Sequence, residues 1–138
     1  NVRMGDPECQ TILPKLKTDF SLIIKKCIEQ KLHDLNIEWY DDKSICIVLC
    51  SKGYPDTYKN NFILNLEKLN LEKNQFIFHA GTKINNNSIV SNGGRVLNVV
   101  TRSSNFKAAR QGSLKLLKEI NWDNGFYRKD IGYKVIQE

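Results

Sequence analysis

The first eight residues bring together side chains that can bind ligands. Asn1, Arg3, Asp6 and Glu8 surround Gly5 in this short segment. Amide and carboxylate oxygens are hard ligands that suit Mg²⁺, and a guanidinium suits two-point recognition of a phosphate or a carboxylate. The segment therefore predicts a site for a metal or an anion, although composition alone favours a solvated polar stretch.

A second candidate site lies at Asn92-Gly93-Gly94-Arg95. Two consecutive glycines can turn their backbone N–H groups toward an anion, and an arginine beside them adds a fixed positive charge. A plain turn with an exposed arginine is the simpler interpretation, because turns of this composition are common. His79 has no carboxylate or serine partner at a useful local spacing, so a structural role is the simpler interpretation for it.

Composition and charge exclude several classes of protein. The chain has 138 residues, 41% of them hydrophobic, which is the size of one globular domain. It contains no apolar stretch long enough for a transmembrane helix and no recognisable secretory leader. The four cysteines lack metal-binding spacing, so we expect free thiols. From the lack of a secretory pattern and of a long apolar stretch, we expect a cytoplasmic location and no membrane partner. The net charge of +6 is interspersed with acidic residues rather than clustered, so we expect no nucleic-acid partner.

Apolar residues at helical spacing predict the two main helices. These are residues 16–35, with Thr18 or Asp19 as the N-cap, and residues 106–120, with Ser103 or Ser104 as the N-cap. The fifteen residues before the first helix show no regular pattern.

Short apolar runs predict the strands. Residues 45–50 are rich in β-branched side chains and indicate a strand buried on both faces, and residues 75–79 indicate another. Asn92-Gly93, between apolar runs on either side, is typical of a hairpin turn. We expect residues 60–74 to form a loop or a weak strand, and the tail from Gly125 to form a turn before a last short strand. The predicted class is α+β, with a small mixed or antiparallel sheet.

Five segments resemble, in the same order, motifs of the phosphoribosylamine–glycine ligases, also called glycinamide ribonucleotide synthetases. They are Asn1-Val2-Arg3-Met4-Gly5-Asp6-Pro7-Glu8, Ser51-Lys52-Gly53-Tyr54-Pro55, Phe78-His79-Ala80-Gly81-Thr82, Gly93-Gly94-Arg95-Val96-Leu97 and Tyr127-Arg128-Lys129-Asp130-Ile131-Gly132. Met4 stands where the family has Phe, and the loop after Tyr58 lacks a glycine that is usual there. The resemblance spans nearly the whole chain.

This resemblance implies an ATP-grasp ligase of purine biosynthesis. Such an enzyme joins glycine to 5-phosphoribosylamine and converts ATP to ADP and phosphate, with Mg²⁺ or Mn²⁺ as cofactor. Residues 1–15 would be the truncated end of the ATP-grasp domain, and residues 16–138 would be the C-terminal α+β domain that packs against it. Because the chain opens inside a motif, we expect a fragment that is inactive without the upstream ATP-grasp domain.

The resemblance also suggests roles for individual residues. Asn1 would bind the metal and Arg3 would be catalytic, while Arg95, with Gly93 and Gly94, would bind the substrate phosphate. Two other functions stay open: the C-terminal domain of a different ATP-grasp ligase of purine metabolism, and a non-enzymatic basic binding module.

Overall fold

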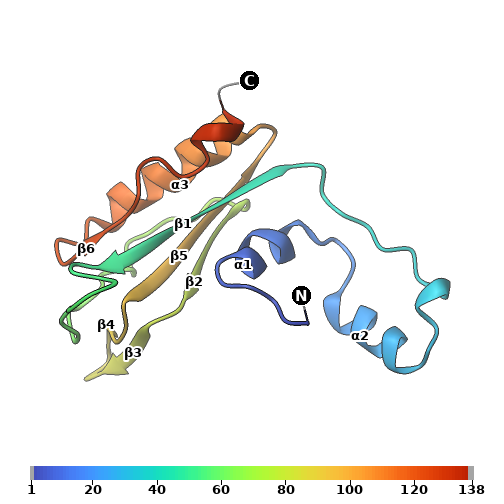
Figure 1. The fold of residues 1–138 in the computed structure, drawn as a ribbon, viewed down its shortest axis with the longest axis horizontal. Helices are drawn as coiled ribbons and strands as arrows, with labels where there is room; N and C mark the ends of the chain where they lie inside the picture. The colour runs from blue at the N-terminus through green and yellow to red at the C-terminus, as the bar shows by residue number, and fades with distance from the viewer. Residues whose placement is uncertain (1, 137–138) are drawn as a thin grey trace.

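The computed structural model describes residues 2–136 and is built around a four-stranded antiparallel sheet with the strand order β2-β5-β1-β6 (Figure 1). A separate hairpin of β3 and β4 adjoins it, and three α-helices complete the fold. The strands are β1 (Lys43–Ser51), β2 (Gln75–His79), β3 (Thr82–Asn85), β4 (Ser88–Ser91), β5 (Arg95–Ser103) and β6 (Gly125–Phe126). The helices are α1 (Glu8–Ile12), α2 (Phe20–Ile28) and α3 (Phe106–Ile120), with short 3₁₀ turns at Leu13–Lys15, Leu32–Asp34 and Tyr133–Val135. The predicted α+β class, with an antiparallel sheet, is confirmed.

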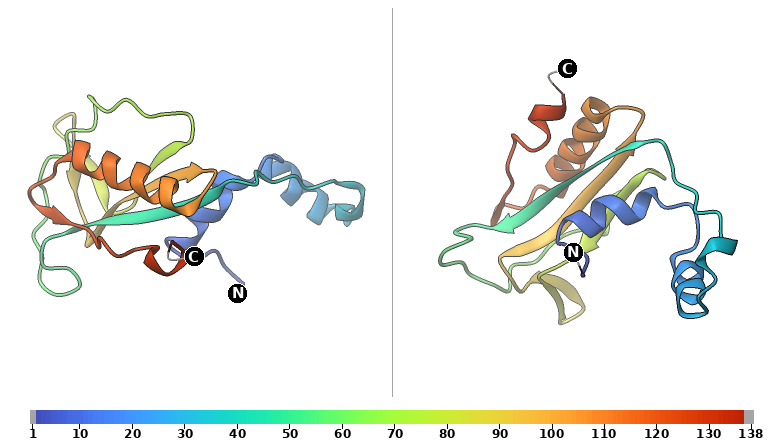
Figure 2. Two further views of the ribbon diagram at one scale, coloured as in Figure 1. Left: turned by 90° about the horizontal axis from the view of Figure 1, so that it is seen from above. Right: turned by 45° about the vertical axis from the view of Figure 1, so that its right-hand side comes forward.

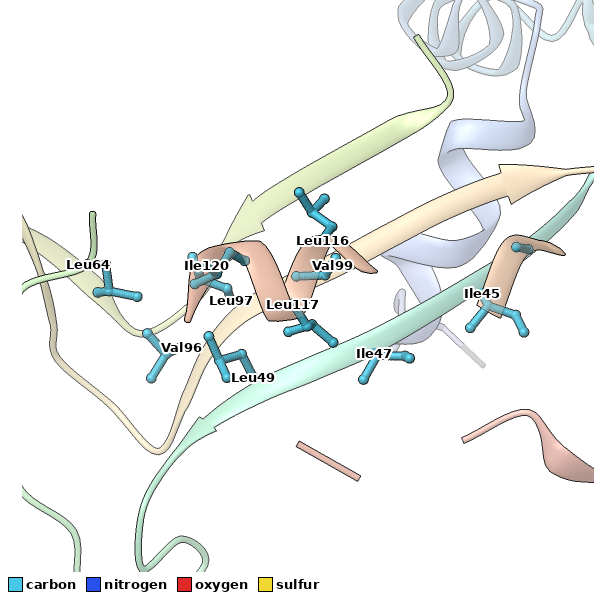
Figure 3. Packing of buried hydrophobic residues seen from close by; sticks show 11 residues of the cluster. Ile45, Ile47, Leu49, Leu64, Val96, Leu97, Val99, Leu116, Leu117 and Ile120 are labelled. Atoms are coloured by element: carbon cyan, nitrogen blue, oxygen red, sulfur yellow. The ribbon is translucent and has the colours of Figure 1, made fainter. Parts of the chain in front are cut away.

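The hydrophobic core lies between α3 and one face of the sheet (Figure 3). Alternate residues of a strand share a face, so the core-facing side chains come from alternate positions of β1 and β5 and from the buried stripe of α3. They include Ile45, Ile47, Leu49, Leu97, Val99, Leu116, Leu117 and Ile120, each at most 5% exposed. Burial of this stripe explains why the predicted helix at residues 106–120 forms over that range.

The N-cap of α3 differs from the prediction. Asn105 takes this position, and its side chain accepts a hydrogen bond of 2.8 Å from the Ala108 N–H. Ser103 is the last residue of β5 and is held in the sheet. Asparagine and serine cap helices about equally well, so local preference alone did not distinguish Asn105 from the two predicted serines.

The predicted hairpin turn at Asn92-Gly93 is wrong. β4 pairs with β3, whereas β5 runs between β1 and β2 in the other sheet. The two-residue loop of the hairpin is Asn86-Asn87, both with positive φ (46° and 60°). Such a pair suits the tight turn that matches strand twist. Residues 92–94 instead carry the chain from one sheet to the other.

The predicted helix at residues 16–35 is much shorter in the structure. Asp19 caps α2 as predicted, accepting hydrogen bonds from the Ser21 and Leu22 N–H groups, but the helix ends at Ile28. Gln30 has a φ of 58°, and the N–H of Lys31 donates to the Lys26 carbonyl at 2.8 Å. This is the Schellman arrangement that ends many helices.

The segment that contains α2 extends away from the sheet (Figure 2). None of the residues of α2 is buried, and Ile28 is 77% exposed. Among the helices of residues 2–136, none is long and apolar enough to cross a membrane.

The second face of the sheet carries α1, which contacts β1 and β5 (Figures 1 and 2). Residues 1–15 were predicted to be irregular, but Glu8–Ile12 forms this short helix. Cys46 and Val48 of β1 lie on that face and are only half-buried, so the strand is fully buried on the α3 side alone. The tail forms β6 and then a 3₁₀ turn at Tyr133–Val135 rather than a last strand after residue 132.

Candidate functional site

A polar cavity of about 360 Å³ joins the two segments that the sequence singled out. Arg3, Gly5, Asp6 and Glu8 line it from the N-terminal segment, and Arg95 lines it from the start of β5. An added Cβ on Gly5 would collide with the Glu8 carboxylate, so that carboxylate folds back over Gly5. The cavity thus holds two guanidinium and two carboxylate groups, which suits a ligand with an anionic group and hydrogen-bond donors.

Arg95 is bound to Asp6 in two places. Its Nη2 lies 3.0 Å from the Asp6 carboxylate oxygen Oδ2, and its Nη1 donates to the Asp6 backbone carbonyl at 3.1 Å. The other carboxylate oxygen, Oδ1, accepts a hydrogen bond of 3.0 Å from Gln10 Nε2 in α1. The two side chains of the ion pair are 42% and 39% exposed, so the pair lies at the rim of the cavity and stays open to solvent.

Gly93 and Gly94 have a packing role in the structure. Neither has a positive φ, and a Cβ on Gly94 would collide with the ring of Tyr54. Both carbonyls bind the end of β1: Ser51 Oγ donates to the Gly93 oxygen and Ser51 N donates to the Gly94 oxygen, each at 2.8 Å. These contacts fix the backbone from which the Arg95 side chain extends.

An apolar cavity of about 500 Å³, which no sequence pattern indicated, lies beside the polar one. Pro7, which follows Asp6 directly, lines this apolar cavity. The other lining residues are Cys46, Val48, Cys50, Tyr54, Pro55, Phe126, Arg128 and Ile131. Burial, with a smaller contribution from the negative charge of Asp6, raises the pKa of the Cys46 thiol to about 12. Burial also raises the pKa of Cys50, against the opposing effect of Arg95. Both thiols are therefore protonated and unreactive near neutral pH.

The remaining motif residues have structural contacts. His79 Nδ1 lies 3.0 Å from the Thr82 hydroxyl at the exposed end of β2, in keeping with the structural interpretation. Arg110 of α3 holds the tail by donating to the Ile131 carbonyl at 2.9 Å and to the Lys129 carbonyl. Arg128 forms a two-point pair with the Asp130 carboxylate at 3.1 and 2.6 Å. That pair lowers the pKa of Asp130.

The structure brings together two of the predicted site residues, Arg3 and Arg95, in one cavity. Asn1, the predicted metal ligand, lies outside the described residues. Within residues 2–136, no three His, Cys, Asp or Glu side chains gather as a group that could hold a metal ion. Sequence reasoning noted Asp6 but missed its pairing with Arg95, because two residues 89 positions apart leave no local signal of contact.

Comparison with known proteins shows which proteins this chain is similar to. The family described as phosphoribosylglycinamide synthetase, C domain, matches residues 44–134. The phosphoribosylamine–glycine ligase of Caldanaerobacter subterraneus subsp. tengcongensis is 45% identical, over 95% of this chain and 31% of that protein. The bifunctional purine biosynthetic protein purD of Dictyostelium discoideum is 44% identical, over 99% of this chain and 17% of that protein.

A solved structure agrees with these sequence matches. The crystal structure of the phosphoribosylamine–glycine ligase from Thermotoga maritima has a TM-score of 0.71 and 25% identity, over 94% of this chain and 32% of that one. The chain spans about a third of the length of the ligases it matches. Because the domain match covers most of its residues, the chain belongs to the phosphoribosylglycinamide synthetase C-domain family.

Proposed function

We propose that this chain is the C-terminal portion of a phosphoribosylamine–glycine ligase of purine biosynthesis. In that reaction, ATP activates the glycine carboxylate as an acyl phosphate. The amine of 5-phosphoribosylamine then attacks the acyl carbon, and glycinamide ribonucleotide, ADP and phosphate are released. The observation that carries the proposal is the similarity over 95% of the chain to a ligase of that name, at 45% identity.

The polar cavity supports a role for Arg95 in binding the 5-phosphate of phosphoribosylamine. A guanidinium has five N–H donors, and the two contacts with Asp6 leave three of them for an anion. Arg3 lines the same cavity and is the second cation there, which fits the catalytic role predicted for it. Gly93 and Gly94 contribute by fixing the backbone that carries Arg95.

The proposal includes the domain arrangement and the metal that the resemblance implies. Residues 1–15 would end the ATP-grasp domain and residues 16–138 would form the C-terminal domain. Asn1 would bind Mg²⁺ or Mn²⁺ together with groups from the upstream domain. The described residues do not form such a site on their own. A cytoplasmic location stays a prediction.

The test is Arg95→Ala in the full-length ligase. Loss of a charge-assisted hydrogen bond costs about 1.5–3 kcal/mol, so the KM for phosphoribosylamine should rise by about ten- to a hundredfold. The KM for ATP should stay nearly unchanged. Lys115→Ala, which removes an exposed cation from α3, is the matched control. An unchanged KM for phosphoribosylamine, or a selective loss of ATP affinity, would contradict the role of Arg95.

A further inference from the structure

The Asp6–Arg95 pair links two parts of the chain that are far apart in the sequence. Asp6 precedes the residues matched by the C-domain family, which begin at residue 44, whereas Arg95 lies within them. The two are 89 residues apart and joined by one ion pair and one hydrogen bond to the backbone. A contact that combines a side-chain carboxylate and a main-chain carbonyl fixes the orientation of a guanidinium as well as its position.

Both ends of this link are held firmly by other contacts. On the Asp6 side, Gln10 of α1 binds the second carboxylate oxygen at 3.0 Å. On the Arg95 side, the main-chain oxygen of Arg95 accepts a hydrogen bond of 2.8 Å from Gly81 N. A Cβ on Gly81 would approach Gly93 Cα to 2.8 Å, so the two segments touch along their backbones. The carboxylate therefore joins two anchored segments and does not simply neutralise a mobile side chain.

We infer that Asp6 is a positioning residue that aims the Arg95 guanidinium at the substrate phosphate. This inference rests on the proposed function. With Nη1 and Nη2 each donating one hydrogen to Asp6, the side chain is held at the rim of the polar cavity that Arg3 also lines. An arginine held in place before the anion arrives loses less conformational freedom on binding than a free one.

The positioning role can be separated from a purely structural one. Asp6 is 39% exposed and belongs to no buried cluster, so replacing it should leave the fold intact. Loss of an exposed ion pair of this kind changes an equilibrium constant by a factor of about two to five. In the full-length ligase, Asp6→Asn should raise the KM for phosphoribosylamine by about that factor. The kcat and the KM for ATP should stay unchanged, and Asp6→Glu should recover part of the loss.

A double-mutant cycle with Arg95→Ala provides the decisive measurement. If Asp6 acts through Arg95, Asp6→Asn has no further effect on the KM for phosphoribosylamine once Arg95 is alanine. Glu119→Gln on α3 removes an equally simple surface carboxylate and should change nothing in either background.

Three results would overturn the inference. Effects of the two substitutions that multiply independently would show that Asp6 does not act through Arg95. A lower KM in Asp6→Asn would show that the carboxylate competes with the phosphate. An Arg95→Ala variant with unchanged KM for phosphoribosylamine would remove the proposed role of Arg95, and this inference with it, whatever Asp6→Asn does.

Discussion

The contact between Gly81 and the start of β5 is tight enough to be tested by adding one methyl group. A Cβ on Gly81 would lie 2.6 Å from the Arg95 carbonyl oxygen and 2.8 Å from Gly93 Cα. Both are backbone atoms, which cannot move aside as a flexible side chain can. Gly81 N donates to the Arg95 oxygen and Asn92 N donates to the Gly81 oxygen, each at 2.8 Å. Gly81→Ala must therefore push apart two segments that are hydrogen-bonded to each other.

We expect Gly81→Ala to destabilise the chain by about 2–4 kcal/mol. Overpacking against atoms that cannot move costs about 1–3 kcal/mol, and each weakened backbone hydrogen bond adds about 1 kcal/mol. For a chain of this length, a loss in that range lowers the Tm by about 10 °C. Urea unfolding followed by circular dichroism measures the change, with the m-value unchanged if only stability is affected.

Gly5→Ala is the matched control for Gly81→Ala. The added Cβ at this position also meets an atom, but that atom is the end of the exposed and flexible Glu8 side chain. The side chain can rotate away, so we expect a change within about 0.5 kcal/mol. If Gly81→Ala proved as harmless as Gly5→Ala, the backbone contact would not hold the start of β5.

Two further predictions concern the isolated chain. The purified 138-residue chain should make no glycinamide ribonucleotide. It spans only about a third of the length of the ligases it matches, and phosphoryl transfer needs the whole nucleotide site. Release of ADP that depends on glycine and phosphoribosylamine would contradict this prediction. At pH 8, iodoacetamide should alkylate the exposed Cys27 well before Cys46, since burial raises the pKa of Cys46 from 9.0 to about 12. Because folding raises this pKa, the stabilising contribution of the protonated thiol is complete below pH 9 and is lost as the pH rises toward 12. Equal labelling rates by mass spectrometry would show that Cys46 is accessible.

The elements that were predicted well from the sequence are those in which the pattern of apolar residues matches the pattern of buried residues. The helix at residues 106–120 has a continuous apolar stripe, and five of its residues are buried against the sheet. The strands at residues 45–50 and 75–79 formed where β-branched and aromatic residues cluster. In each case, local preference and tertiary packing favour the same structure.

The wrong predictions concern places where no local residue pattern marked the end of an element, or where a turn-like pattern is needed for packing instead. The helix α2 ends at Ile28 and is followed by a left-handed Gln30. Glycine is the residue usually found at that position, so a glutamine there does not indicate the end of a helix. The turn signal at Asn92-Gly93 was stronger than that at Asn86-Asn87, yet the latter pair forms the hairpin. The glycines at residues 93 and 94 are needed for a different reason, because Gly81 and Tyr54 pack directly against their backbone. A close approach between distant segments cannot be recognised from local spacing.

The candidate site also depends on a contact between distant segments that local spacing does not reveal. The sequence identified the N-terminal segment and the segment around Arg95 separately, each with a simpler non-functional interpretation. The two segments converge in one cavity, and this convergence depends on α1 lying across the second face of the sheet. Since the family domain begins at residue 44 and the cavity is lined by Arg3, Asp6 and Glu8 as well as Arg95, the domain alone cannot form this site. A ligand held there would contact both segments, so its binding would depend on how firmly the N-terminal segment is seated on the sheet. The Asp6–Arg95 pair is a polar contact at that junction, and it joins the N-terminal segment directly to the guanidinium that lines the cavity.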